Sequence, residues 1–275
     1  GWAASEKVQA NFSVIACSGA EAAPSSNTIK AYASASNSFD LSVNSTISGK
    51  TSMAEISDCS SLPYENMTYS LKNDVNDPAT CMYARANNVT LDCHGLMINY
   101  SQSATGYGVN NSGYNYSTMR SCNIVQGNPG SPSANSYGIY MTNASSGIIF
   151  NNTLRYYGTS TGPVTGAISL AYGSYNNSVY GNAINSSGYA SDGVDMYYNA
   201  NNNLVYSNII RTNGSGGAGI YIYANSYGNN LSHNNITTTS DNGYGIVLLT
   251  TAYKNIVYGN NINTNATLSY GVVFQ

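Results

Sequence analysis

Charged residues are scarce in this chain of 275 residues, which has only 9 Lys and Arg and 12 Asp and Glu, or 8% of the sequence. Soluble domains ordinarily carry about 25% charged residues. So few basic side chains cannot neutralise a phosphate backbone, which excludes nucleic-acid binding. No run of about 18 apolar residues exists, so no membrane-spanning helix is expected. With only two histidines and no C-x-x-C pair, no metal site and no cofactor are predicted.

Small uncharged polar residues are abundant instead. The chain contains 40 Asn, 39 Ser and 21 Thr, and 26 Tyr stand against 4 Phe and 1 Trp. Apolar residues still make up 42%, which is enough to form a core and argues against disorder.

Two sequence motifs recur with one period of 26 residues. The first occurs at 181–184, 207–210, 233–236 and 259–262, and the second at 193–196, 219–222, 245–248 and 271–274. Equivalent positions continue back to about Val89 in steps of 26 to 30 residues, with Gly-, Pro- and Ser-rich insertions. Two motifs with the same period indicate a repeat architecture of about seven rungs.

Each repeat contains short segments in which apolar and polar residues alternate, such as Val194 and Met196 around Asp195. This pattern is typical of short strands with one buried face. A coil of 26 residues cannot bury that face alone, whereas stacked coils about 4.8 Å apart enclose a common core. The sequence therefore predicts an all-β parallel β-helix of about seven 26–30-residue rungs.

Stacking places each residue over its equivalent in the next coil. The asparagines at 152, 182, 208, 234 and 260 are predicted to form a hydrogen-bonded ladder. Phe150, Tyr180, Tyr206 and Tyr258 are predicted to form an aromatic column, interrupted by Ser232. Like charges stacked in this way would repel, which explains the low charge.

The run Asn88–Gly95 (NVTLDCHG) precedes repeats of the form N-x-[LIV]-x-x-N-x-I and G-[IV]-x-[ILMF]. This combination resembles the right-handed parallel β-helix repeat proteins of the pectate-lyase-like superfamily, and especially the surface and secreted members common in archaea. The resemblance covers about residues 59–275 and implies a right-handed helix. It does not imply one activity, since that superfamily contains lyases, hydrolases, epimerases and non-catalytic surface proteins.

Residues 1–57 do not share the period and are predicted to form an N-terminal β-strand extension, with residues 58–275 as the β-helix. Lys7–Cys17 alternates as a strand, and Leu41, Val43 and Ile47 suggest another. The sequence ends inside the last predicted strand, and an open strand edge can pair with another chain. One interpretation is a homopolymer joined through the N-terminal strands and the β-helix ends. The alternative is that the extension folds back as a cap.

Two features suggest an extracellular location. Of five cysteines, Cys59 and Cys81 flank one loop-like segment and are the predicted disulfide; buried free thiols are the alternative, and they suit Cys93 and Cys122 better. Fifteen Asn-x-Ser/Thr sequons are candidate N-glycosylation sites. They lie at Asn11, Asn44, Asn66, Asn88, Asn99, Asn110, Asn115, Asn143, Asn151, Asn176, Asn185, Asn213, Asn230, Asn235 and Asn265.

Acid–base chemistry on polysaccharides needs two carboxylates about 5–10 Å apart. Asp192 and Asp195 are the local pair, and Arg211 is the nearest candidate cation, at a position equivalent to Arg155. Solvated surface charge is the blander interpretation of this pair. Asp92 is interpreted as a structural corner.

His94 and His233 have no evident nucleophile or carboxylate partner in the sequence, so no catalytic site is predicted. We therefore expect a secreted or cell-surface structural glycoprotein that self-assembles and is not an enzyme. The alternative is a carbohydrate-binding or carbohydrate-active β-helix whose tyrosine columns stack on sugar rings.

Overall fold

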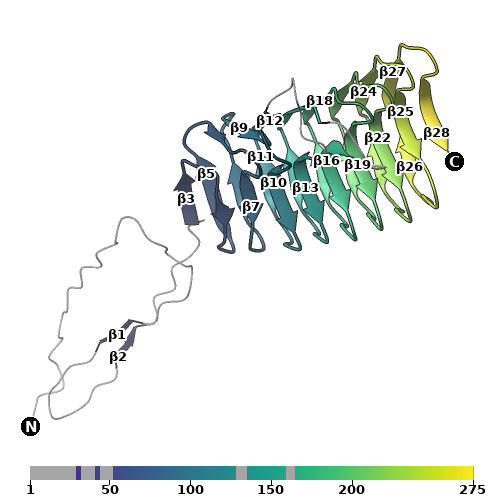
Figure 1. Ribbon diagram of the computed structural model, residues 1–275. Coiled ribbons are helices and arrows are strands. Elements are labelled where there is room, and N and C mark those ends of the chain that lie inside the picture. The colour runs from purple at the N-terminus through teal and green to yellow at the C-terminus, as the bar shows by residue number, and fades with distance from the viewer. Residues whose placement is uncertain (1–28, 32–40, 44–51, 128–134, 159–164, 275) are drawn as a thin grey trace, which may run out of the picture. The chain divides into compact units, whose positions relative to one another are not determined.

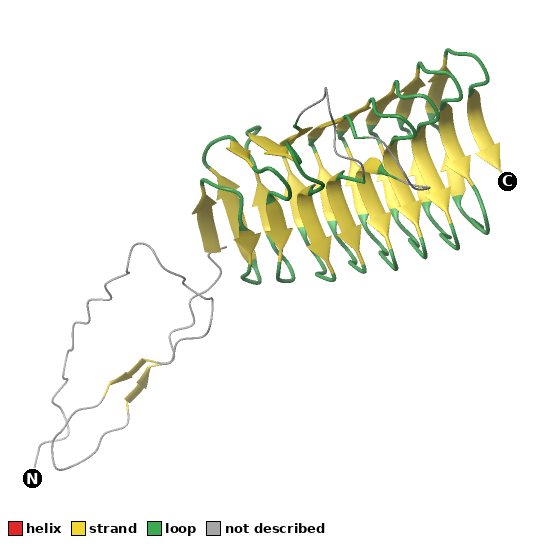
Figure 2. Cartoon of the chain, viewed as in Figure 1, coloured by secondary structure: helices red, strands yellow, loops and turns green. Residues whose placement is uncertain are grey.

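The computed structural model describes residues 29–31, 41–43, 52–127, 135–158 and 165–274. Every regular element in these ranges is a β-strand, and three long sheets run side by side along a solenoid (Figures 1 and 2). All neighbouring strands within the three sheets pair in parallel, as in β19 with β22. We call these sheets B, C and D and give their strands below; each full coil passes through B, then D, then C.

The three sheets have nine, nine and eight strands among the described residues. Sheet B consists of β3 (Ser52–Ile56), β5 (Met67–Leu71), β8 (Thr90–Asp92), β11 (Thr118–Arg120), β14 (Ile148–Phe150), β17 (Ser178–Tyr180), β20 (Leu204–Tyr206), β23 (Asn230–Ser232) and β26 (Ile256–Tyr258). Sheet C consists of β4 (Ser61–Leu62), β7 (Met82–Ala84), β10 (Tyr107–Ser112), β13 (Tyr137–Thr142), β16 (Gly166–Ala171), β19 (Asp192–Tyr197), β22 (Ala218–Tyr223), β25 (Tyr244–Leu248) and β28 (Tyr270–Phe274). Sheet D consists of β6 (Val75–Asn76), β9 (Met97–Tyr100), β12 (Asn123–Gln126), β15 (Thr153–Tyr156), β18 (Ala183–Ser186), β21 (Ile209–Thr212), β24 (Asn235–Thr238) and β27 (Asn261–Thr264).

The predicted all-β parallel β-helix is confirmed, with about eight coils where seven were expected. The register follows the sequence repeats: Ile184 pairs with Leu154 on one side and Ile210 on the other. Val194 likewise lies between Ile168 and Ile220. These inward-facing residues are fully or almost fully buried and form one continuous core.

The predicted asparagine ladder is present in the structure. The side-chain oxygen of Asn208 accepts hydrogen bonds of 3.0 Å from both the backbone N–H and the side-chain amide of Asn182. The amide of Asn208 then donates to the side-chain oxygen of Asn234 at 3.0 Å. The same bonds join Asn152 to Asn182 and Asn234 to Asn260, so the ladder runs through all five predicted asparagines. It satisfies backbone groups at a corner where no strand pairing is available.

A second ladder was not predicted from the sequence. It consists of Asn177, Asn203, Asn229 and Asn255, whose side chains are joined at 3.0–3.1 Å. The asparagine-rich composition therefore has one structural cause that acts at two corners of the coil.

The corner between sheets B and D requires a left-handed backbone. His94, Ser121, Asn151, Ser207 and His233 all have φ between 51° and 56° at this corner. Asn and His adopt this conformation more readily than most non-glycine residues. Both histidines of the chain therefore lie in this corner, His94 between β8 and β9 in a longer turn over 93–96 and His233 between β23 and β24 in a shorter one over 233–234.

The chain divides into two units, of which the first comprises residues 1–47. Within it, β1 (Ile29–Ala31) pairs antiparallel with β2 (Leu41–Val43). β2 contains Leu41 and Val43 of the second strand predicted from the sequence. The strand predicted over Lys7–Cys17 lies outside the described residues, as does Ile47. β3 pairs with β5 and so belongs to the solenoid although it precedes residue 58; the division at residue 57 remains a prediction.

Two disulfides join neighbouring coils. Cys59 and Cys81, the pair expected from the sequence, are bonded. Cys93 and Cys122 are also bonded, so their interpretation as free thiols is wrong. These two cysteines are 29 residues apart along the chain but occupy adjacent coils, and that proximity becomes evident only once the register is known.

We expect Asn182→Ala to destabilise the solenoid by about 2–3 kcal/mol, because it removes the hydrogen bonds that this side chain makes with buried groups on both neighbouring coils. Asn185→Ala changes an exposed side chain of the same coil and should alter the free energy of unfolding by less than about 0.5 kcal/mol. Urea unfolding of both variants measures the difference. Equal midpoints would show that the ladder does not stabilise the fold.

Candidate functional sites

The outer face of sheet B carries a polar cluster in three successive coils. Ser70, Asp92 and Arg120 occupy equivalent positions on β5, β8 and β11, so parallel pairing places them in one column. Arg120 donates from Nε and Nη2 to Oδ2 of Asp92, at 2.9 and 2.8 Å. Opposite charges thus lie on adjacent coils, where like charges would repel.

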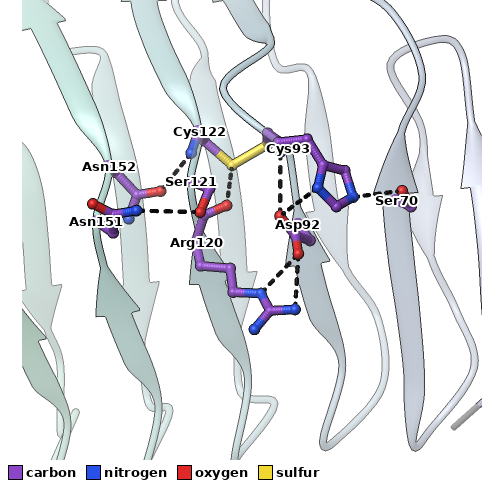
Figure 3. A network of polar contacts seen from close by, with 9 residues as sticks. Ser70, Asp92, Cys93, Arg120, Ser121, Cys122, Asn151 and Asn152 are labelled. Atoms are coloured by element: carbon purple, nitrogen blue, oxygen red, sulfur yellow. Dashed lines mark hydrogen bonds and ion pairs between the residues drawn. A yellow bond between two sulfur atoms is a disulfide. The ribbon is translucent and has the colours of Figure 1, made fainter.

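His94 joins this cluster from the left-handed corner after β8. Its Nε2 lies 2.9 Å from the hydroxyl of Ser70, and its Nδ1 lies 3.6 Å from Oδ1 of Asp92 (Figure 3). The backbone N–H of His94 also donates to Oδ1 of Asp92 at 3.2 Å. The prediction that His94 has no nucleophile or carboxylate partner is therefore wrong, because residues 24 positions apart meet across neighbouring coils.

The cluster lies between two hollows in the surface. One, of about 460 Å³, is lined by Asp92, His94, Arg120 and the threonines Thr68, Thr90 and Thr118. The other, of about 600 Å³, is lined by His94, Asn151 and Arg155 among others. The imidazole lines both hollows and its side chain is 54% exposed, whereas Asp92 is buried. Asp92 is thus an ion-paired member of this cluster rather than only a corner residue.

His233 occupies the equivalent corner at the other end of the solenoid. Its ring contacts Tyr258 edge-to-face, with 5.2 Å between centroids. Among the described residues its ring nitrogens make no hydrogen bond or ion pair.

Asp192 and Asp195 form the second cluster, at β19 of sheet C. Both side chains are buried, so their interpretation as solvated surface charges is wrong. Burial raises the pKa of Asp195 to about 8, and only the Ser169 hydroxyl on the preceding coil opposes this shift. Burial also raises the pKa of Asp192 well above its ordinary value, although the N–H of Ala218 donates to its Oδ1 at 2.7 Å.

Tyrosines surround the Asp195 carboxyl. The hydroxyls of Tyr137 and Tyr197 lie 3.5 Å apart, and burial raises the pKa of each, with a further increase from the nearby Asp195 charge. Tyr156, on sheet D, is affected by the same carboxyl. Asp195 therefore lies inside the protein, protonated at neutral pH and shielded from solvent.

Asp192 instead borders a groove of about 600 Å³ over the C-terminal coils of sheet C. Tyr221, Tyr244 and Tyr270 line the same groove, together with Val247 and other apolar side chains. The rings of Tyr244 and Tyr270 are stacked with 6.0 Å between centroids. Burial, followed by the charge of Asp192, raises the pKa of Tyr221 to about 12. The groove thus brings a carboxyl with a raised pKa close to a phenol.

The arginines considered for an acidic site lie elsewhere. Arg155 and Arg211 are on β15 and β21 of sheet D, with Asn185 between them as predicted. Neither lines the groove beside Asp192, and the described residues contain no ion pair between Arg211 and an aspartate. The grouping of Asp192 and Asp195 with Arg211 is therefore not supported.

The aromatic column on sheet B is present as predicted. Phe150 stacks on Tyr180 and Tyr180 on Tyr206, with centroids 5.2 and 4.9 Å apart. Because the ring faces cover one another, mainly ring edges and hydroxyls are left for a ligand. Sugar stacking along this column is therefore disfavoured, and the rings serve to pack the wall.

The sequons differ in accessibility. Of the candidates, Asn11 and Asn44 lie outside the residues whose side chains are described. Asn99, Asn110, Asn115 and Asn230 are half-buried. The nine exposed positions are Asn66, Asn88, Asn143, Asn151, Asn176, Asn185, Asn213, Asn235 and Asn265.

No protein-family model matches the chain, and no curated protein matches its sequence. Among solved structures, the chain is similar to the periplasmic alginate epimerase AlgG, with 13% identity, a TM-score of 0.45, and coverage of 72% of this chain and 51% of that chain. It spans about half the length of AlgG. It is also similar to two A-modules of Azotobacter vinelandii mannuronan C-5 epimerases. For AlgE6 the identity is 11%, the TM-score 0.35 and the coverage 81% and 89%; for AlgE4 they are 10%, 0.28, and 80% and 83%. This likeness concerns the fold.

The prediction that the protein is not an enzyme is corrected. These similar solved structures are all epimerases. The physical reason for that prediction also fails, because the chain contains a buried acidic pair and a histidine in contact with serine and aspartate.

In the described residues, no helix is long and apolar enough to cross a membrane.

The buried Asp195 predicts a pH-dependent stability. Its carboxyl keeps a proton up to about pH 8 in the folded protein but loses it near 3.8 when exposed, so the folded state binds more protons in between. Stability should therefore fall as pH rises from 4 to 8, by about 1.4 kcal/mol per pH unit for this group. Asp192 adds a second contribution of the same sign.

Asp195→Asn should remove the contribution of Asp195 and flatten the dependence, as measured by urea unfolding at pH 5, 6 and 7. Asp241→Asn, at an exposed position, is the matched control and should leave the slope unchanged. Parallel curves for the wild type and Asp195→Asn would contradict the assignment.

Proposed function

We propose that the protein is a carbohydrate-active β-helix that holds a neutral polysaccharide in the groove over sheet C. The observation that carries this proposal is the combination of Asp192 with three tyrosines, Tyr221, Tyr244 and Tyr270, in one groove of about 600 Å³. Pockets that are mostly apolar with a few convergent polar groups are typical of ligand sites.

The charge of the groove favours a neutral glycan. Its described lining contains no Lys, Arg or His, and Asp192 is its sole acidic residue. A polymer of uronic acids would bring carboxylates into this groove without a cation to neutralise them, which is unfavourable at low dielectric. Hydroxyl groups, in contrast, can accept hydrogen bonds from Tyr221 and, in its neutral form, from Asp192.

Asp192 can also act as an acid in this groove. A carboxyl with a raised pKa can donate a proton to the leaving oxygen of a glycosidic bond, as general acids do. A water molecule then adds to the anomeric carbon and releases its proton to solvent, since the described groove contains no second carboxylate. Asp192 borders the groove, whereas Asp195 is shielded from it by tyrosines, so Asp192 is the proposed acid. Burial is the main cause of the raised pKa of Asp192, and the charge of Asp195, when that residue is ionised, raises it further.

Binding of neutral and anionic polysaccharides, measured by affinity electrophoresis, tests the substrate class. We expect mannans or glucans to bind and alginate or polygalacturonate to bind at least tenfold more weakly. Tyr244→Ala should weaken binding about tenfold, a loss of about 1.4 kcal/mol. Tyr180→Ala, on the outer face of sheet B, is the control and should bind like the wild type.

Release of reducing ends from the bound polysaccharide tests the chemistry. Asp192→Asn should abolish release while leaving binding within about threefold, because the amide keeps the shape but cannot donate an acidic proton. Preference for an anionic polymer, or equal binding by Tyr244→Ala and Tyr180→Ala, would overturn the proposal.

The sequence also leads us to propose an extracellular location, covalent N-glycans and association with further copies of the chain. We expect an extracellular protein with N-glycans on some of the exposed sequons, and intact mass before and after enzymatic deglycosylation measures this. Self-association into a polymer, the structural role first predicted, is measured by light scattering of the full chain. An unchanged mass after deglycosylation would contradict the presence of N-glycans. A single monomeric species in light scattering would contradict self-association.

A further inference from the structure

We propose that Ser70, His94 and Asp92 form a serine-nucleophile site that hydrolyses small acyl esters. This site lies on sheet B and is independent of the groove over sheet C. The proposal rests on the contacts of the three side chains and on the hollow beside them.

The three groups have the order that nucleophilic catalysis requires. The Ser70 hydroxyl is 2.9 Å from Nε2 of His94, within the range for transfer of its proton. The other ring nitrogen faces Oδ1 of Asp92 at 3.6 Å, and such a contact commonly shortens when substrate binds. Asp92 can therefore orient the imidazole and stabilise it once it carries the proton.

The surrounding structure holds this arrangement in place. Asp92 is fixed by the two hydrogen bonds from Arg120, which engage its other oxygen and leave Oδ1 for His94. The corner that carries His94 is tied to the next coil by the Cys93–Cys122 disulfide (Figure 3). The N–H of Gly95 also donates to the carbonyl of Ser121 at 2.6 Å.

The hollow beside the cluster can accept an acyl group. It has a volume of about 460 Å³, and His94, Asp92, Arg120, Thr90 and Thr118 are among its lining residues. Ser70 is not in this lining but contacts the imidazole that is. Threonine hydroxyls are of the kind that can donate to an oxyanion. Ser70 itself is only 6% exposed, which restricts the acyl group to a small one such as acetyl.

The reaction is balanced without a cofactor. Ser70 Oγ bonds to the ester carbonyl carbon as His94 Nε2 takes the hydroxyl proton. The bond from this carbon to the alcohol oxygen then breaks, and His94 returns the proton to that oxygen. Water attacks the acyl-serine in the same way, so the products are a carboxylic acid, an alcohol and the original hydroxyl.

A fluorophosphonate probe on the full chain tests the nucleophile. We expect covalent labelling at Ser70, located by peptide mass spectrometry, and hydrolysis of p-nitrophenyl acetate at a measurable rate. Ser70→Ala should abolish both. Ser178→Ala, also on sheet B but with no histidine beside it, is the matched control and should retain both.

His94→Ala should lower the rate of labelling at Ser70 by at least about 100-fold, since the general base is lost. Added imidazole should restore part of this rate, which a purely structural role of His94 would not allow. Thermal unfolding checks that the variant is folded. No labelling of Ser70 in the wild type, or equal labelling in His94→Ala, would overturn the proposal.

The outcome is separable from the function proposed for the groove. Ser70→Ala should bind neutral polysaccharide like the wild type, because the two sites lie on different sheets. Loss of esterase activity with unchanged polysaccharide binding would support this site alone.

Discussion

The structure depends on one constraint, which is that each residue lies directly over its equivalent in the next coil. Parallel pairing at a fixed register repeats every side-chain environment along the solenoid. Amides tolerate this repetition because one group can donate and accept in the same direction, and two asparagine ladders result. Aromatic rings tolerate it by stacking. Like charges do not, and the low content of Lys, Arg, Asp and Glu follows from that repulsion.

At both candidate sites, ionisable side chains lie close together without the repulsion that stacked like charges would cause. On sheet B, Asp92 and Arg120 have opposite charges on neighbouring coils, so stacking becomes attractive. On sheet C, Asp192 and Asp195 avoid repulsion because burial favours their neutral forms. Departures from local consistency are expected mainly where a protein has a function. The rest of the solenoid carries few other charged residues.

Several features could be predicted because they depend only on periodicity. The register of Ile184 with Leu154, the ladder of Asn182 and the stacking of Phe150 on Tyr180 all follow from aligning the repeats. The second ladder at Asn177 could have been found from the same alignment, since Asn203, Asn229 and Asn255 keep the 26-residue step. The link between Cys93 and Cys122 was missed because a 29-residue separation does not by itself indicate contact.

The sequence by itself determined the solenoid, its register and the chemical character of its wall, because these properties repeat and every coil supplies the same information. It could not determine the sites, which occur once and depend on what surrounds a single side chain. Asp195 reads as a surface charge in an alternating strand, but tyrosines from other coils bury it and keep it protonated. His94 has no partner within its own coil's motif, yet the curvature of the corner brings its ring to Ser70 one coil away. Only the tertiary structure decides such contacts, since they depend on side-chain direction as well as on register.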